Sequence, residues 1–405
     1  MKRLYSLEKE FNSENTDKEF SNLVCVGNLL DAFSSRKAEL SRGKIEVIMT
    51  ESDFSKVGSL VLNPLKSCGI QPLLLLIEEN DFHYTSVKKS FSTGLSGVIA
   101  VGDKNLLSFV RYYASLSDIP CYALPTTPYF ESISSSNVYL KTSGLLAVMP
   151  AKPYKNVFID EAVILKAENK HFSKAYISVM SKLTALIDYK IDCFLSGNKV
   201  DAELFSTVKK AINTLATITA YENYKTAIIG AELLILSINF NSPFSGSGVW
   251  VIKNALSLFS KKLSGGDKTL IAFEKTAKIY HMLFSNDFSD LLSVPDYEGD
   301  LLTLEEYSGY ERAHFYKNLK IPSEKRRKLI NLLLDKTRDD FKKETAVILS
   351  ALPSVIKIYS QLNGKNRQTI SYKQTKNAVN LGSYLTDRTS ALTLCRDLGI
   401  LKCAN

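Results

Sequence analysis

Several features that would assign a chain to a functional class at once are missing from this sequence. No apolar run is long enough to cross a bilayer, and the run at residues 71–77 has the length of a buried strand. The first residues contain neither an apolar core nor a small-residue cleavage site, so we expect no signal peptide. The six cysteines stand without paired spacing, which is typical of free thiols in a reducing compartment and favours a cytoplasmic protein.

Histidine is scarce, and its placement excludes a simple metal-binding motif. The four histidines are His83, His171, His281 and His314, and no two of them stand three or four residues apart. We expect His281 to be a core or helix-surface residue and His171 to be exposed. A Walker A motif and a Gly-x-Ser-x-Gly elbow after a strand are also absent, which excludes the common P-loop and hydrolase designs.

Positive charge exceeds negative charge, but no long basic tract accompanies the excess. The chain has 51 lysines and arginines against 42 acids, a formal net charge of +9 and a pI of about 9.0. Such a balance can indicate nucleic acid or an anionic ligand as the partner. The lysines are spread along the whole chain, and the densest cluster, at residues 325–328, lies inside a helical pattern. A solvated basic surface is the favoured interpretation, and we expect neither nucleic acid nor a membrane as the partner.

Short apolar strands alternate with helical stretches in the first part of the chain. Strand-like runs occupy residues 44–49, 73–77, 97–101, 121–124 and 156–160, and helical spacing occupies residues 54–68, 84–91 and 106–117. This alternation predicts βαβ units and a mostly parallel, Rossmann-like sheet. We assign residues 1–22 to a polar N-terminal segment and residues 23–166 to an α/β nucleotide-binding-like domain.

After residue 166 the apolar periodicity becomes helical. Segments with this spacing cover residues 172–195, 201–221, 225–239, 248–263, 268–284, 323–334 and 338–362. Residues 167–405 are therefore predicted to form an all-helical domain. The fold class predicted for the chain is an α/β domain followed by an all-α domain.

The turn after the strand at residues 97–101 is the first candidate site. Gly102 ends the strand, and Asp103, Lys104 and Asn105 open the next helix. In parallel sheets ligands lie beyond the carboxyl ends of the strands, where the N–H groups of a helix N-terminus can hold a pyrophosphate. Only one glycine stands in this turn. Both a reshaped anion site and an ordinary turn capped by Asp or Asn fit these residues, and we favour the capped turn.

Four stretches of the chain resemble, in order, the motifs of one superfamily. They are Pro-Thr-Thr-Pro at residues 125–128, the segment at 150–160, Lys-Leu-Thr-Ala-Leu-Ile-Asp-Tyr at 182–189 and the segment at 378–401. Together they resemble the dehydroquinate-synthase-like superfamily, which includes the iron-containing alcohol dehydrogenases, and look closest to its glycerol-1-phosphate dehydrogenase branch. The resemblance covers roughly residues 24–401 and implies the dehydroquinate-synthase-like fold.

The resemblance implies an NAD(P) cofactor, but the residues at its binding positions depart from the family pattern. The family's glycine-rich turn is replaced by Gly102, Asp103 and Lys104. Asp103 would put a carboxylate where the pyrophosphate lies in the family, and like charges at close range repel. Thr126 and Thr127 match the family segment under the nicotinamide. The cofactor-binding residues are thus present only in degenerate form.

The resemblance also implies a divalent metal held by one Asp and two His, and none of the three is found. Ser178, Val249 and Gly265 align with these ligand positions, and Gly248 aligns with the family Glu beside the first His. A hydroxyl, an isopropyl group and a hydrogen atom cannot replace the ligands of a catalytic ion. We therefore expect no metal. Glu131, which stands where the family often has an Asp near the substrate, is the remaining catalytic candidate.

Three functional hypotheses follow. The leading one is a glycerol-1-phosphate dehydrogenase-like pseudoenzyme without redox activity or NAD(P). It would bind a small phosphorylated ligand or a protein partner, as a homodimer or in a complex with an active paralogue. The alternative is an active NAD(P)-dependent oxidoreductase acting on a phosphorylated polyol with a rearranged site that uses Glu131, Lys104, Lys152 or Lys268. The third is an interaction protein whose basic surface binds nucleic acid or a membrane.

Overall fold

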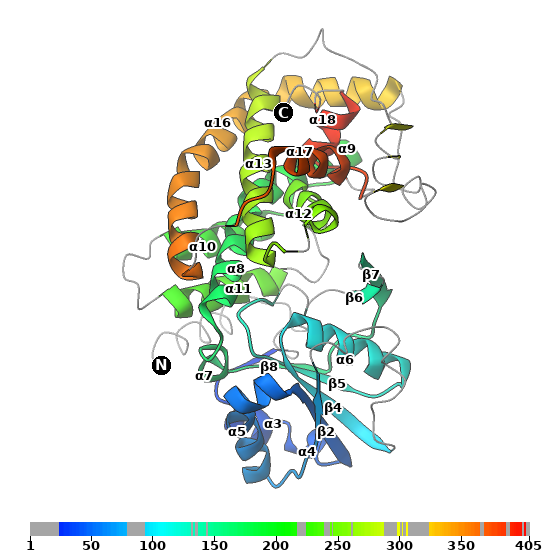
Figure 1. The fold of residues 1–405 in the computed structure, drawn as a ribbon, viewed down its shortest axis with the longest axis vertical. Helices are drawn as coiled ribbons and strands as arrows, with labels where there is room; N and C mark the ends of the chain where they lie inside the picture. Colours follow the sequence, from blue (N-terminus) through cyan, green and yellow to red (C-terminus); the bar gives the residue numbers. More distant parts are fainter. Residues whose placement is uncertain are drawn as a thin grey trace. The chain divides into compact units, whose positions relative to one another are not determined.

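The computed structural model, drawn in Figure 1, separates into two compact units. It describes residues 24–78, 94–130, 133, 137–142, 145–216, 224–238, 244, 246–260, 262–286, 298–299, 302, 305–306, 324–364, 368–385, 389–398 and 401. The first unit comprises Met1–Ala175 and Thr207–Ser242, and the second comprises Tyr176–Ser206 and Pro243–Asn405. We call them the α/β unit and the helical unit, and we describe each by itself.

Six strands form a parallel sheet in the α/β unit. The order of the strands is β1-β8-β5-β4-β2-β3, and all neighbouring pairs are parallel. The strands are β1 (Val24–Val26), β2 (Lys44–Thr50), β3 (Leu73–Ile77), β4 (Leu95–Gly102), β5 (Cys121–Pro125) and β8 (Asn156–Ile159). The predicted Rossmann-like sheet is confirmed. Of these six strands, β1 alone was not predicted, because three residues are too few to show an apolar period.

Helices pack on this sheet and supply its core. α3 (Leu29–Ser35) and α5 (Glu51–Ser67) contribute to one apolar cluster with β2, in which Val47, Val57 and Val61 are buried. α6 (Lys104–Leu116) contacts β4 and β5. The remaining elements are α4 (Lys37–Leu40), α7 (Glu161–Ile164) and the antiparallel hairpin of β6 (Asn137–Thr142) and β7 (Leu145–Pro150). The helix predicted at residues 84–91 lies outside the described residues.

The direction of the chain across the sheet reverses between β2 and β4. From β2 the chain passes to β3 at the edge and then returns to β4 on the other side of β2. The helices that follow these strands, α5 and α6, therefore begin close together at the carboxyl edge of the sheet, after Thr50 and Gly102. Such a reversal is the place where open parallel sheets bind ligands.

The rest of the described chain is helical, as the sequence predicts. The helices are α8 (Asn169–Met180), α9 (Lys182–Ser196), α10 (Ala202–Ala216), α11 (Tyr224–Ile238), α12 (Gly248–Phe259), α13 (Gly265–Ser285), α16 (Glu324–Asn363), α17 (Tyr372–Gly382) and α18 (Ala391–Asp397). The single helix predicted at residues 172–195 is divided at Ser181 into α8 and α9. The two helices predicted between residues 323 and 362 are one helix, α16, because the residues between them are tolerated in a helix interior.

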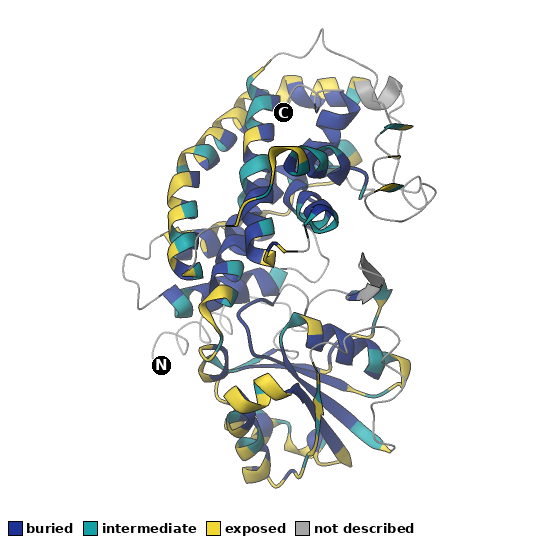
Figure 2. Cartoon of the chain, viewed as in Figure 1, coloured by how far each residue is buried: buried dark blue, intermediate teal, exposed yellow. Residues whose placement is uncertain are grey.

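One segment of the described chain, Lys328–Asn363 in α16, is long and apolar enough to cross a membrane by length and composition alone. Figure 2 shows that burial follows one side of this helix. Its buried residues, among them Phe341, Ile348 and Tyr359, recur at helical spacing, and α16 contacts α13. One-sided burial of this kind is typical of an amphipathic helix packed on the core of its own domain.

Candidate functional site

The turn between β4 and α6 is capped by its own carboxylate. Asp103 is the N-cap of α6, and its Oδ1 accepts hydrogen bonds from the backbone N–H of Asn105 at 2.8 Å and of Leu106 at 3.1 Å. The predicted capped turn is therefore confirmed. The N–H groups at a helix N-terminus are those that a bound pyrophosphate would use, and at this turn two of them are bonded to Asp103.

Gly102 is required by packing at this turn. A Cβ added to Gly102 would lie 2.3 Å from Cδ2 of Leu106, a side chain that is fully buried. The carbonyl of Gly102 also accepts a hydrogen bond from the N–H of Thr126 at 3.0 Å, which ties the ends of β4 and β5 together. The close fit of strand and helix accounts for this glycine without any ligand.

A second carboxylate lies at the start of α5, the other helix that begins where the direction of the chain across the sheet reverses. Asp53 lies in the first turn of α5, where it bonds to the N-cap Thr50, and its Oδ1 accepts a hydrogen bond from the hydroxyl of Thr126 at 3.0 Å. Burial raises the pKa of Asp53 above its usual value, hydrogen bonds from Thr50 and Thr126 oppose the rise, and the charge of Asp103 adds to it. Thr127 is buried next to Thr126. The starts of α5 and α6 thus each carry an acid, Asp53 and Asp103, which disfavours a polyanion there.

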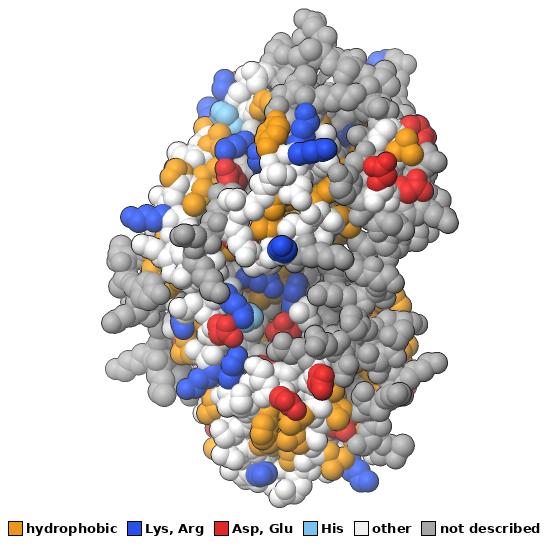
Figure 3. Space-filling model, in the orientation of Figure 1, with side chains coloured by type: hydrophobic (Ala, Val, Ile, Leu, Met, Phe, Trp, Pro, Cys, Tyr) orange, Lys and Arg blue, Asp and Glu red, His pale blue; other side chains and the backbone are white. Residues whose placement is uncertain are grey.

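Two basic side chains lie close to Tyr129, which follows β5. The ammonium group of Lys104 lies 5.3 Å from the ring centroid of Tyr129, and that of Lys174 on α8 lies 4.5 Å from the same centroid. His171, one turn before Lys174, is half-buried rather than exposed as predicted. Burial and then the charges of Lys170 and Lys174 lower the pKa of His171 to about 4. Figure 3 shows both basic and acidic side chains beside a histidine near the middle of the drawn face. We call Lys104, Tyr129 and Lys174 the basic cluster.

In the helical unit, side chains pack closely around the N-terminus of α12, where the sequence comparison aligns Gly248 with a Glu and Val249 with a metal-binding His. The N–H of Gly248 donates to Oδ2 of Asp188 at 2.9 Å. A Cβ at Gly248 would lie 2.2 Å from the hydroxyl oxygen of Tyr280. Val249, aligned with the first family His, is buried. No side chain can therefore start at position 248 unless Tyr280 moves.

Asp188, on α9, is hydrogen-bonded to three other helices of this unit. Besides the N–H of Gly248, its carboxylate accepts the hydroxyl of Tyr280 at 2.6 Å and the N–H of Ala391, at the start of α18, at 2.8 Å. Burial raises the pKa of Asp188 to about 7, although these hydrogen bonds lower it in part. The sequence predicts a cap or surface acid here. Asp188 does cap the first turns of α12 and α18, but it does so from a buried position on α9.

The aligned metal positions do not come together. Tyr280 lies beside Gly248, whereas the ammonium of Lys268 donates to Ser257 near the other end of α12 at 3.2 Å. α12 and α13 are therefore antiparallel. Gly265 stands fifteen residues before Tyr280 on α13, which is roughly 22 Å of helix. Positions 249 and 265 consequently lie near opposite ends of the helix pair, too far apart to share one ion.

The remaining candidate metal ligands, Ser178 and His281, lie on different helices, α8 and α13. Ser178, on α8, is buried. The ring nitrogens of His281 are within hydrogen-bond distance of the hydroxyls of Thr345, at 3.1 Å, and Ser285, at 3.3 Å, as expected of a structural histidine. Within the described ranges, no group of three or more His, Cys, Asp and Glu side chains is placed to hold a metal ion. The residues at the family positions thus do not fit a catalytic metal.

The lysines proposed for a rearranged site are also dispersed. Lys152 is exposed, forms an ion pair with Asp118, and donates its N–H to Ser115 near the C-terminal end of α6. Lys104 is the first residue of α6, so the two lysines flank opposite ends of this helix. Lys268 belongs to the helical unit, where it bonds to Ser257. Glu131 lies outside the described residues.

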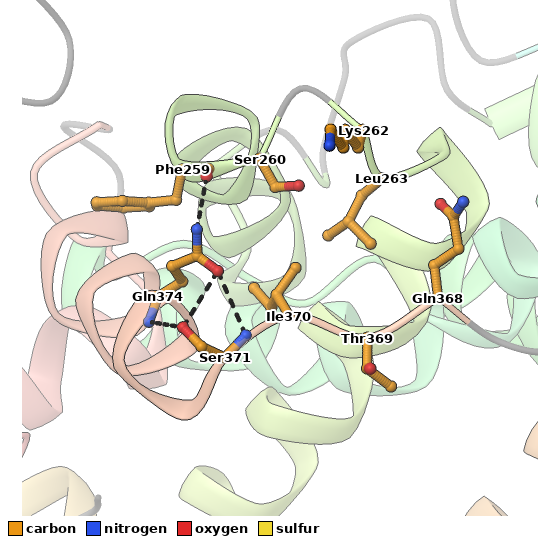
Figure 4. Close-up of a pocket in the computed structure, with 9 residues that line it drawn as sticks. All are labelled: Phe259, Ser260, Lys262, Leu263, Gln368, Thr369, Ile370, Ser371 and Gln374. Carbon is orange, nitrogen blue, oxygen red and sulfur yellow. Dashed lines mark hydrogen bonds between the residues drawn. The ribbon is translucent and has the colours of Figure 1, made fainter.

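A pocket in the helical unit offers a second candidate site. It has a volume of about 920 Å³ and lies between the end of α12 and the starts of α13 and α17. Figure 4 shows that Gln374 links its walls by donating to the Phe259 carbonyl at 3.0 Å and accepting from Ser371. Its described lining contains one charged residue, Lys262, and no acid, histidine or cysteine. Apart from Lys262, the described lining of the pocket therefore offers no side chain typical of acid–base catalysis, and it offers no metal ligand.

Several of these residues could not be found by reading local patterns. Asp53 alone had a local signal, because Thr50 and Asp53 form the spacing of a helix cap directly after a strand. Tyr129 and Lys174 are 45 residues apart in the sequence and meet only through the sheet topology. Asp188 was visible within a family motif, but its burial depends on α12, α13 and α18 packing around it.

Comparisons with known proteins agree with this architecture. No family model matches the chain. The glycerol-1-phosphate dehydrogenase [NAD(P)+] of Bacillus velezensis is 20% identical over 219 residues, which cover 49% of this chain and 55% of that protein. The protein of the same name from Pyrococcus horikoshii is 24% identical over 214 residues, which cover 53% of this chain and 55% of that protein. The chain thus spans about half the length of the curated relatives it matches.

Solved structures match over more of the chain. A 1,3-propanediol oxidoreductase superposes with a TM-score of 0.59 at 12% identity, covering 95% of this chain and 98% of that one. The iron-containing alcohol dehydrogenase of Thermotoga maritima superposes with a TM-score of 0.55 at 12% identity, covering 93% and 98%. At such identities the likeness shows the fold alone. The chain has the dehydroquinate-synthase-like fold of the iron-containing alcohol dehydrogenases, and over about half its length its sequence is similar to glycerol-1-phosphate dehydrogenases.

Proposed function

We propose that the chain is a glycerol-1-phosphate dehydrogenase-like protein that has no metal-dependent redox activity and works by binding a ligand or a partner. The observation that carries the proposal is the position of Asp103. Its carboxylate bonds to two N–H groups at the start of α6, where a dinucleotide would need them. A pyrophosphate would have to displace this carboxylate and approach its charge and that of Asp53.

The helical unit supports the same proposal. A family-type Glu at position 248 would collide with Tyr280, and the buried carboxylate of Asp188 engages both the backbone N–H of Gly248 and the tyrosine hydroxyl. Among the described residues, no group of three or more His, Cys, Asp and Glu side chains is placed to hold the ion that polarises the reacting oxygen in metal-dependent hydride transfer.

The test is a titration of the purified full chain with NADH and NADPH, followed by nicotinamide fluorescence, together with an assay of glycerol 1-phosphate oxidation with NAD⁺ and NADP⁺. We expect no binding at millimolar cofactor and no turnover. Cofactor binding with turnover that is lost on metal removal would instead establish the alternative, an active oxidoreductase acting on a phosphorylated polyol. The basic cluster is the feature that favours this alternative, because ammonium groups suit a phosphorylated substrate.

The assembly state belongs to the same proposal. A protein without its own redox site can act through a second copy of itself or through an active paralogue, and a cytoplasmic location goes with either role. Light scattering of the purified chain, alone and mixed with an active glycerol-1-phosphate dehydrogenase, would distinguish these assemblies. A chain that stays monomeric in both samples would restrict the proposal to ligand binding.

A further inference from the structure

Two segments that are distant in the sequence line the pocket of the helical unit. One joins α12 to α13, and the other, residues 368–371, precedes α17 and lies in neither a helix nor a strand. In Figure 4 the side chains of Leu263 and Ile370 point toward each other, whereas Thr369 points the opposite way from Gln368 and Ile370. Side chains that alternate in direction indicate an extended backbone. One wall of the pocket is therefore an extended stretch of chain.

This extended wall has hydrogen-bonding groups to spare. In the part of the chain that the structure describes, the backbone groups of Thr369 and Ile370 make no hydrogen bond. Gln368 accepts the N–H of Ser264 with its Oε1 at 3.2 Å, so its amide is held in place while the amide nitrogen stays available as a donor. Open backbone of this kind is what an added peptide strand pairs with.

The walls of the pocket are positively charged. Residues 248–266 and 365–386, which include both segments, contain seven lysines and arginines and no acid. Lys262 is exposed and forms no ion pair with a residue of the described ranges. The nearest acid in the sequence, Asp267, is buried and accepts the hydroxyls of Ser264 at 2.7 Å and Tyr359 at 3.1 Å. An anionic group is therefore favoured beside Lys262.

We propose that this pocket binds the carboxyl-terminal end of an extended peptide of a partner protein, with the terminal carboxylate at Lys262 and the last side chain between Leu263 and Ile370. The inference rests on the proposed function, because it names the class of partner that the chain would bind. A peptide end carries one carboxylate, which one ammonium group compensates, and amides that suit Gln368 and the open backbone. The volume of about 920 Å³ leaves room for a few residues, since ligand sites measure roughly 300–1,000 Å³.

The lining favours a peptide over a nucleic acid. A groove for single-stranded nucleic acid combines several cations with aromatic rings on which bases stack. The described lining has one cation, Lys262, and its aromatic side chain, Phe259, is buried. Gln374 donates to the Phe259 carbonyl and accepts from Ser371, so the walls are already tied together without a ligand. A preformed site of this kind loses little conformational entropy on binding.

The test is isothermal titration calorimetry on the full chain with two forms of the peptide acetyl-Ala-Ala-Leu, one with a free carboxylate and one with a terminal amide. We expect the carboxylate form to bind with a dissociation constant below about 1 mM and the amide form to bind roughly tenfold more weakly, because it lacks one charge-assisted contact. Lys262→Gln should weaken the carboxylate form by the same factor and leave the amide form unchanged. This pattern distinguishes a contact with the carboxylate from a general loss of positive charge.

Lys336→Gln is the matched control, since it removes an exposed lysine from the same unit. The pocket lies at the start of α13, where Tyr359 of α16 bonds to Asp267. Phe341 of α16 packs instead on Phe284, at the other end of α13, and Lys336 belongs to the turn of α16 beyond it. The control should therefore bind both peptides as the unmodified chain does.

The apolar contact has its own test. Ile370→Thr keeps a β-branched side chain and replaces one arm by a hydroxyl, at a half-buried position that tolerates the change. It should weaken acetyl-Ala-Ala-Leu several-fold and leave acetyl-Ala-Ala-Ala unchanged, because only the leucine peptide reaches this surface. Equal losses for the two peptides would overturn the placement of the last side chain.

The remaining outcomes decide the proposal as a whole. Equal affinity for the carboxylate and amide forms would overturn it, as would binding that survives unchanged in Lys262→Gln or an absence of binding at millimolar peptide. A short oligothymidylate that binds more tightly than the peptide and loses affinity in Lys262→Gln would assign the pocket to nucleic acid and overturn it too. None of these results touches the proposed lack of redox activity, which fails only if NAD(P) binds and turns over.

Discussion

The hydroxyl of Tyr280 donates to the buried carboxylate of Asp188 at 2.6 Å, and the same hydroxyl oxygen lies 2.2 Å from the position where a side chain at residue 248 would begin. Tyr280, Asp188 and Gly248 therefore depend on one another. The glycine leaves room for the tyrosine, the tyrosine donates to the carboxylate, and the carboxylate accepts the N–H of the glycine at 2.9 Å.

The first prediction concerns this dependence. Gly248→Ala should lower the free energy of unfolding by about 1–3 kcal/mol, because the new methyl group overpacks a full core. Tyr280→Phe removes the oxygen that the methyl group meets, so the double variant should lose less stability than the sum of the two single variants. Urea unfolding of the four chains measures the difference. Strictly additive losses would show that the two residues do not compete for the same space.

The second prediction concerns pH. The pKa of Asp188 is about 7 in the folded chain, against an ordinary value of 3.8. The folded state therefore favours the protonated carboxyl. This preference stabilises the folded chain fully below about pH 4, and the stabilisation is lost as the pH rises to 7. A tenfold change in proton affinity is worth about 1.4 kcal/mol, so the loss approaches roughly 4 kcal/mol for the full difference.

Denaturant unfolding of the full chain between pH 4 and pH 8 measures this effect. Asp188→Asn should flatten the decline, and Asp335→Asn, at an exposed position of α16, should leave it unchanged. The other titratable groups against Asp188 are Tyr280, Cys395 and Asp192. Burial raises the pKa of the tyrosine and of the cysteine, so neither ionises in this range. A decline in the free energy of unfolding that persists in Asp188→Asn would show that another group causes it.

The fold was predictable because its signals are local. β3 follows its apolar run residue for residue, and the change from strand to helix periodicity marks the helical half. The capped turn at Asp103 was predictable for the same reason, since a cap involves only neighbouring residues. The β6–β7 hairpin was not predicted, and α16 was divided in error where polar residues interrupt its apolar face.

The candidate site was predictable only in part, because its contacts are not local. Gly102, Thr126 and Thr127 lie at the carboxyl edge of the sheet, as the motif order indicates. The lysines around Tyr129 come from separate helices, and no pattern in the sequence connects them. The positions aligned with the two metal-binding histidines lie near opposite ends of α12 and α13, a separation that depends on how the two helices pair.

The third prediction concerns the cap of α6. Asp103→Ala should lower the free energy of unfolding by about 1 kcal/mol, because two backbone N–H groups lose their acceptor. Asp103→Ser keeps an acceptor and removes the charge, so stability should be nearly unchanged. Urea unfolding of both variants provides the measurement, and a serine variant as unstable as the alanine variant would contradict the role of the side-chain acceptor.

The last prediction concerns metal removal. A divalent ion bound with a hundredfold excess over its dissociation constant would stabilise the folded chain by about 2.7 kcal/mol, and a chelator would remove that stabilisation. Ser178, Val249 and Gly265 offer an ion no ligand set, and positions 249 and 265 lie too far apart to share one. Incubation with EDTA followed by dialysis should therefore leave the midpoint of thermal unfolding unchanged. Mass spectrometry of the native chain should find less than one divalent ion in ten chains. One bound ion per chain, with a midpoint that falls on chelation and recovers on adding the ion back, would show that other residues of the chain build a metal site and would return redox catalysis to consideration.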